Sequence, residues 1–146
     1  MDITAVRQAI ATQIQATIPA PFEAYWYQPD MPTVPACWLQ PTKVSYDLAY
    51  GPHGLEQIDL DLVVLVSRAD DLSGQQALDK YLHGTGASSL KAAIESGRAQ
   101  YGGSAYTGVL DDLWVRDMDR YQHWQAGDTV FLGASLHIMV IGSGNA

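Results

Sequence analysis

The chain has little cysteine, little basic charge and no long apolar run. Its 146 residues include one cysteine, Cys37, so no disulfide can form within the chain and nothing in the cysteine count indicates secretion. Lys and Arg number 8 and are scattered, against 16 Asp and Glu, which gives a formal net charge of −8. Phosphate recognition needs clustered basic side chains, so this composition argues against nucleic-acid binding. The longest apolar stretch is too short to span a bilayer, and the N-terminus lacks a signal peptide's basic and apolar regions.

The most apolar run, Ile58–Val66, predicts the central strand of a sheet. Hydrophobic residues make up 47% of the chain, enough for residues 1–146 to form one domain with a substantial core. Side chains alternate between the faces of a strand. One face of this run is therefore wholly apolar, and the other changes from acidic at Asp59 and Asp61 to apolar at Val63 and Leu65.

The remaining periodicity predicts the other elements. A helix is expected over Met1–Ile18, an extended segment at Phe22–Tyr27, strands over Ala36–Gln40, Val44–Tyr50, Leu113–Tyr121 and Thr129–Ile141, and helices over Gln75–His83 and between Ser88 or Ser89 and Gly97. In the last strand, every second residue from Val130 to Val140 is apolar. The predicted fold class is α+β: a mostly antiparallel sheet of four to five strands, with an N-terminal helix and a central helix pair packed on one face.

Local signals predict where several elements begin and end. Asp2 or Thr4 can cap the first helix, and Ser73 begins a capping box for the second. Pro35 and Pro41 are expected to mark the ends of the strand that contains Cys37.

Asp59 and Asp61 are the first candidates for chemistry, because alternation places both carboxylates on one strand face. Such a pair can hold a metal ion or act as an acid and base. No histidine or third acid follows nearby in the sequence. A solvated or interface-facing sheet surface is therefore the favoured interpretation.

Asp117, Asp119 and His123 are a second candidate set, which could form a metal triad. Strict alternation places both aspartates on the face of Leu113 and Val115. Arg116 and Arg120 flank the aspartates and would compensate their charge, so a cross-strand ion-pair face is favoured.

No motif for catalysis or cofactor binding is present in the sequence. The four histidines lack metal-ligand spacing, and His137 is expected to be a packed or interface histidine. A Gly-x-Ser-x-Gly elbow is absent, and Gly102-Gly103-Ser104 lacks the lysine of a phosphate-binding loop. We therefore predict no enzymatic activity and no catalytic residue, cofactor or metal. A small enzyme built around Cys37 and a spatially close histidine remains an alternative.

Aromatic residues are numerous, with 4 Trp and 8 Tyr, and several fall in expected loops or at strand ends. Tyr and Trp are favoured at protein–protein interfaces. The expected hairpin Val44–Gly54 and the loop Tyr101–Gly108 are therefore candidate contact segments. With the acidic strand face, they give a set of predicted interface residues: Tyr46, Tyr50, His53, Asp59, Asp61, Tyr101 and Tyr106.

Residues 35–95 carry a resemblance to a known family. The most specific phrases are Ser67-Arg68-Ala69-Asp70-Asp71, Gln75-Gln76-Ala77-Leu78-Asp79-Lys80-Tyr81-Leu82 and Ser88-Ser89-Leu90-Lys91-Ala92-Ala93-Ile94. In these phrases and in the order of its parts, the chain resembles the tail terminator proteins of long-tailed bacteriophages of the siphophage type.

The resemblance implies a structural virion protein that forms a homo-hexameric ring at the head-proximal end of the tail tube. Such a ring ends tube polymerisation and provides the surface to which the head is joined. The implied partners are further copies of the chain, the major tail tube protein and a head–tail connector or stopper protein. DNA would pass through the lumen only as non-specific cargo, and no membrane is involved. The implied location is the neck region of the virion tail, after assembly in the host cytoplasm. Another neck component, a stopper or adaptor, is the alternative within the same class.

Overall fold

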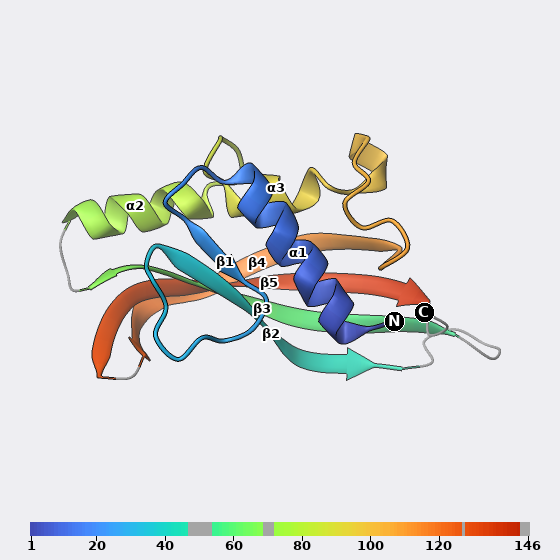
Figure 1. The fold of residues 1–146 in the computed structure, drawn as a ribbon, viewed down its shortest axis with the longest axis horizontal. Helices are drawn as coiled ribbons and strands as arrows, with labels where there is room; N and C mark the ends of the chain where they lie inside the picture. The colour runs from blue at the N-terminus through green and yellow to red at the C-terminus, as the bar shows by residue number, and fades with distance from the viewer. Residues whose placement is uncertain (47–53, 69–71, 127, 144–146) are drawn as a thin grey trace.

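The computed structural model describes residues 1–46, 54–68, 72–126 and 128–143 (Figure 1). Along the chain its elements are α1 (Ile3–Thr17), β1 (Glu23–Tyr25), β2 (Ala36–Ser45), β3 (Leu55–Arg68), α2 (Leu72–Leu82), α3 (Leu90–Glu95), a 3₁₀ turn (Ala99–Tyr101), β4 (Asp112–Ala126) and β5 (Thr129–Ser143). The predicted fold class is confirmed as α+β.

The strands form one five-stranded sheet in the order β1-β2-β3-β5-β4. The β1–β2 pair is parallel, whereas β2–β3, β3–β5 and β5–β4 are antiparallel. The predictions that Ile58–Val66 is a central strand and that the sheet is mostly antiparallel are therefore confirmed. In Figure 1, α1 crosses the strands obliquely, and α2 and α3 run along the upper side of the view.

The main core joins buried side chains of all three helices to one face of the sheet. From the helices come Val6, Ile10, Ile14, Leu78, Leu90, Ala93 and Ile94; from β3 come Ile58, Leu60, Leu62 and Val64; from β5 come Leu132, Ala134, Leu136, Ile138 and Val140. The period-two pattern of β3 and β5 produces this face. At about 25 cal/mol per Å² of apolar surface, burying one of the Val, Leu or Ile side chains in this core contributes roughly 1.5–3 kcal/mol.

A second, smaller cluster lies on the opposite face of the sheet. Its buried members are Trp38, Val63, Leu65 and Phe131, with Tyr25, Val34 and Trp124 packed against them. Val63 and Leu65 are the apolar end of the second face of β3. The predicted change of that face from acidic to apolar is therefore confirmed.

The helix starts agree with the sequence in two of three cases. The Asp2 side chain accepts hydrogen bonds from the backbone N–H groups of Thr4 and Ala5, and Ser89 caps α3 through Ala92 N–H. The prediction for Ser73 was wrong, because α2 already begins at Leu72. Several cap-type residues precede this helix in the sequence, so the pattern could not identify the first helical residue.

The prediction that strand β2 ends at Pro41 was wrong, because β2 continues to Ser45. The register with β3 shifts between Pro41 and Lys43, and Thr42 Oγ1 donates to the backbone oxygen of Asp59 at 3.1 Å. Pairing with β1 reaches only Trp38, so Pro41 lies where β2 is an edge strand. Edges and bulges are the places where a strand tolerates proline. The hairpin predicted beyond Tyr46 lies outside the described residues.

Candidate functional site on the polar face of the sheet

The strongest cluster of polar side chains lies on the sheet face opposite the main core, beyond the Trp38 cluster. The register places these side chains in adjacent rows: Asp61 pairs with His137, His137 with Asp117, and Ser135 with Asp119. We call this surface the polar face; it comprises Lys43, Asp59, Asp61, Arg116, Asp117, Asp119, Arg120, Ser135, His137 and Met139.

His137 is at the centre of the polar face and contacts aspartates through both ring nitrogens. Its Nδ1 lies 2.6 Å from Asp61 Oδ1 in β3. Its Nε2 lies 3.0 Å from Asp119 Oδ1 and 3.7 Å from Asp117 Oδ1, both in β4. The imidazole therefore joins three adjacent strands.

Two arginines of β4 balance part of the negative charge. Arg116 Nε lies 3.4 Å from Asp117 Oδ2, and Arg120 Nη2 lies 3.7 Å from Asp61 Oδ2. The Arg120 guanidinium also lies 4.4 Å from the centre of the Trp124 ring. The predicted ion-pair face is thus confirmed in its geometry, with pairs that also reach β3 and β5.

The prediction that Asp117 and Asp119 share a face with Leu113 and Val115 was wrong. The register shifts between Val115 and Asp117, so one extra residue, Arg116, turns the following aspartates to the opposite face. A bulge inserts one residue and reverses the alternation that the sequence suggests. The histidine beside the aspartates is consequently His137 and not His123, which pairs with Leu132 on the other face.

The electrostatics of the polar face favour a protonated His137. Burial by itself lowers the pKa of the imidazole. The hydrogen bonds that the imidazole donates to Asp119 and Asp61, together with the negative charges of these carboxylates, outweigh that effect and raise the pKa above the ordinary histidine value of 6.5. A charged imidazolium can donate from both nitrogens, as this geometry requires.

An open hollow lies beside His137, lined by Thr42, Asp59, Asp61, Arg116, His137 and Met139. Among the residues that the structure describes, no group of three or more His, Cys, Asp or Glu side chains has an arrangement that could hold a metal ion. The carboxylates approach the imidazole and the guanidinium groups instead. The chemistry that this arrangement supports is ion pairing.

The two aspartates predicted from β3 have different surroundings. Asp61 is mostly covered, with 15% of its side chain exposed, and contacts His137. Asp59 pairs with Met139 and accepts a hydrogen bond from Gln57 Nε2 at 3.0 Å. The more exposed carboxylates of this face are Asp117 and Asp119, with 54% and 57% of their side chains exposed. The role of these two on the polar face depends on a bulge that the sequence analysis did not detect.

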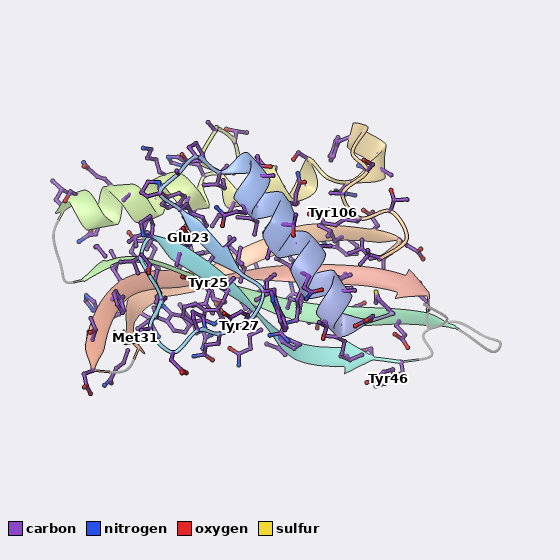
Figure 2. The ribbon with its side chains drawn as sticks, in the orientation of Figure 1. Glu23, Tyr25, Tyr27, Met31, Tyr46 and Tyr106 are labelled. Atoms are coloured by element: carbon purple, nitrogen blue, oxygen red, sulfur yellow. The ribbon has the colours of Figure 1, made fainter. Side chains whose placement is uncertain are left out.

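The predicted interface tyrosines differ in exposure. Tyr46 and Tyr101 are exposed, and Arg98 lies over the Tyr101 ring at 5.4 Å. Figure 2 shows Tyr46 at the far end of β2 and Tyr106 within the body of the molecule. Tyr50 and His53 lie outside the described residues.

Tyr106 is a core residue, so its prediction as an interface residue was wrong. It is 4% exposed, and its hydroxyl donates to the Ile94 carbonyl at 2.8 Å. A Cβ at Gly97 would come within 2.9 Å of the Tyr106 ring, so the absence of a side chain there allows the ring to pack against α3. The glycine-rich loop folds back on the helix, which a loop composition alone does not indicate.

Cys37 lies in the main core and is fully buried. Burial raises the pKa of its thiol well above the ordinary value. Its side chain and that of His137 belong to opposite faces of the sheet. These positions do not support a nucleophilic site built from Cys37 and a histidine.

Comparison with known proteins gives no assignment: no family model matches the chain, and no curated protein matches it significantly. Within the described part of the chain, none of the helices has the length and apolar character needed to cross a bilayer.

Proposed function

We propose that this chain is a ring-forming subunit of a long-tailed phage virion that acts as the tail terminator. The observation that carries the proposal is the polar face of the sheet, on which Asp117 and Asp119 are exposed in a chain whose net charge is −8. The order of elements adds support: α1, the β2–β3 pair, the α2 and α3 helices and the long β5 follow one another as the resemblance implies.

Exposed carboxylates suit the wall of a channel that DNA passes without binding. Like charges repel at close range, and the repulsion is screened within about 8 Å at physiological salt. Asp117 and Asp119 meet the requirement of exposure better than Asp61, which is mostly covered. Arg116 and Arg120 reduce the charge of the face, so DNA repulsion would depend on the two exposed aspartates.

Exposed aromatic and aliphatic side chains supply candidate contacts to tube and neck proteins. Tyr46 and Tyr101 are 64% and 62% exposed, and Met31 is 65% exposed on the segment between β1 and β2. Figure 2 shows Met31 toward the opposite end of the molecule from Tyr46. A subunit between the tail tube and the head needs two contact regions, and Met31 and Tyr46 provide one candidate toward each end.

The first test is the mass of the purified chain in solution, measured by light scattering over a concentration series, with negative-stain images of the same sample. We expect a closed ring, or a monomer that assembles into a ring on the ends of purified tail tubes. A stable monomer or dimer that does not bind tubes would refute the proposal. Rings that bind the portal side of the neck and ignore tube ends would identify a stopper or adaptor instead.

The channel wall is tested with Asp117→Lys and Asp119→Lys combined, against Asp30→Lys and Asp111→Lys as a control pair. Asp30 and Asp111 are exposed and lie outside the polar face, so both double variants change the net charge equally. We expect assembled rings of the first variant to retain duplex DNA in a salt-dependent manner. Equal DNA retention by both variants would contradict a channel role for the polar face.

A further inference from the structure

His137 has an acidic partner on each ring nitrogen, and this geometry requires two donors. Nδ1 faces Asp61 at 2.6 Å, and Nε2 faces Asp119 at 3.0 Å. A neutral imidazole carries one N–H and one lone pair. In the neutral form, one of the two aspartates would therefore face a lone pair, and that contact would become repulsive.

The part of β4 that His137 contacts is short and lies between two irregularities. Register shifts occur between Val115 and Asp117 and between Asp119 and Gln122, so only residues 117–119 pair regularly with β5 between them. Arg120, within the second shift, has a φ of 52°, in the left-handed region. Bulges disrupt the ladder locally, so side-chain contacts carry more of the attachment of this segment.

Every strand beside His137 contributes charged groups to its surroundings. These groups are Asp59 and Asp61 of β3, Arg116, Asp117, Asp119 and Arg120 of β4, and Lys43 of β2, while the flanking Ser135 and Met139 of β5 are uncharged. The two arginines lie beside Asp117 and Asp61, at 3.4 and 3.7 Å. The closest atoms to the ring nitrogens are carboxylate oxygens, which favour the charged imidazolium.

We infer that His137 is a proton-dependent clamp, whose imidazolium form holds residues 117–119 of β4 against β5 and β3 and whose neutral form releases them. The raised pKa of His137 brings the change of state toward neutral pH. Protonation thus attaches the exposed acidic segment to the sheet, and loss of the proton loosens that segment while the main core stays packed. The inference does not depend on the proposed function.

The clamp is tested on the full chain by nuclear magnetic resonance between about pH 5.5 and 9, a range that covers histidine titration. The titration midpoint of the His137 ring is measured, together with the protection of the amides of residues 117–119 from hydrogen exchange. We expect a midpoint above 6.5 and protection that falls as the pH rises through it, while protection in β3 stays constant. A midpoint at or below 6.5, or protection that does not change with pH, would overturn the inference.

Variants separate the clamp from ordinary packing. Asp61→Asn and Asp119→Asn should each lower the midpoint, whereas Asp59→Asn, on the same face without a contact to the ring, should change it less. In His137→Gln, the protection of residues 117–119 should be low and independent of pH. The same pH-dependent loss of protection in His137→Gln and wild type would refute the clamp. If His137→Gln does not fold, the inference is still tested by the wild-type titration and by the titration midpoints of Asp61→Asn and its control Asp59→Asn.

Discussion

Gly133 is the position in β5 where a single methyl group should be most disruptive. It pairs with Leu65 on one side and Gln122 on the other, and both neighbouring strands have a register shift beside it. A Cβ at this position would overlap the backbone oxygen of Val64 and come within 2.6 Å of Leu65 Cδ2 and 2.8 Å of Trp124 Cδ1. The glycine therefore permits a close approach between strands.

The expected cost of Gly133→Ala follows from these contacts. Overpacking a well-packed site costs about 1–3 kcal/mol, and a backbone oxygen within a ladder cannot move aside as a side chain can. Replacing glycine also restricts the unfolded chain, which returns about 0.4–1 kcal/mol. The net expectation is a loss of about 1–2 kcal/mol in the free energy of unfolding. For a chain of this size, that corresponds to a fall in Tm of roughly 3–8 °C.

Gly142→Ala is the matched control, because Gly142 lies in the same strand and its Cβ would also meet an atom. That atom is Met1 Sδ at 2.5 Å, part of a flexible side chain that can rotate away. We expect Gly142→Ala to change the free energy of unfolding by less than about 1 kcal/mol. Urea unfolding followed by circular dichroism measures both variants. Equal stability of the two variants would refute the argument that backbone crowding at Gly133 requires glycine.

Three further predictions concern groups that the structure places in the core or on the polar face. Tyr106→Phe removes the hydrogen bond to the Ile94 carbonyl and should lower the free energy of unfolding by about 0.5–1.5 kcal/mol. The loss stays modest because Gly97 N–H also donates to that carbonyl, which is therefore not left without a partner. Urea unfolding with no loss would contradict the buried hydrogen bond. The Cys37 thiol should react with an aromatic disulfide reagent only as fast as the chain opens, and prompt reaction of the folded chain would disprove its burial. The raised pKa of His137 stabilises the fold fully below pH 6.5, and this stabilisation is lost as the pH rises through the raised value. The pH dependence of unfolding should therefore weaken in His137→Gln, and identical profiles would contradict the shift.

Patterns confined to one strand predicted much of the fold. The alternation in Ile58–Val66 predicted its central position, its wholly apolar face and the change of its second face from acidic to apolar. The alternation in Thr129–Ile141 also predicted a core strand, although Val130 at its hairpin end is 48% exposed. These predictions hold because burial on one face imposes a period of two, whichever strand is the neighbour.

The candidate site was only partly predictable, because it depends on pairing between distant segments. The sequence placed Asp59 and Asp61 on one face. His137, however, lies 76 residues after Asp61 in the chain and contacts it only because β3 and β5 pair in this register. The extra residue at Arg116 reverses the faces of β4, and no local signal marks it. Tyr106 failed for a related reason: the loop's composition does not show that it folds onto α3.

The interruptions in β4 also bear on how copies of this chain can associate. An edge strand with a long run of evenly spaced backbone groups can template further strands and grow without limit. β4 is the outer strand on its side of the sheet, and its bulges leave only residues 117–119 in regular register between them. Charged side chains occupy the same stretch, from Arg116 to Arg120. This edge therefore opposes open-ended, edge-to-edge strand pairing between copies of the chain.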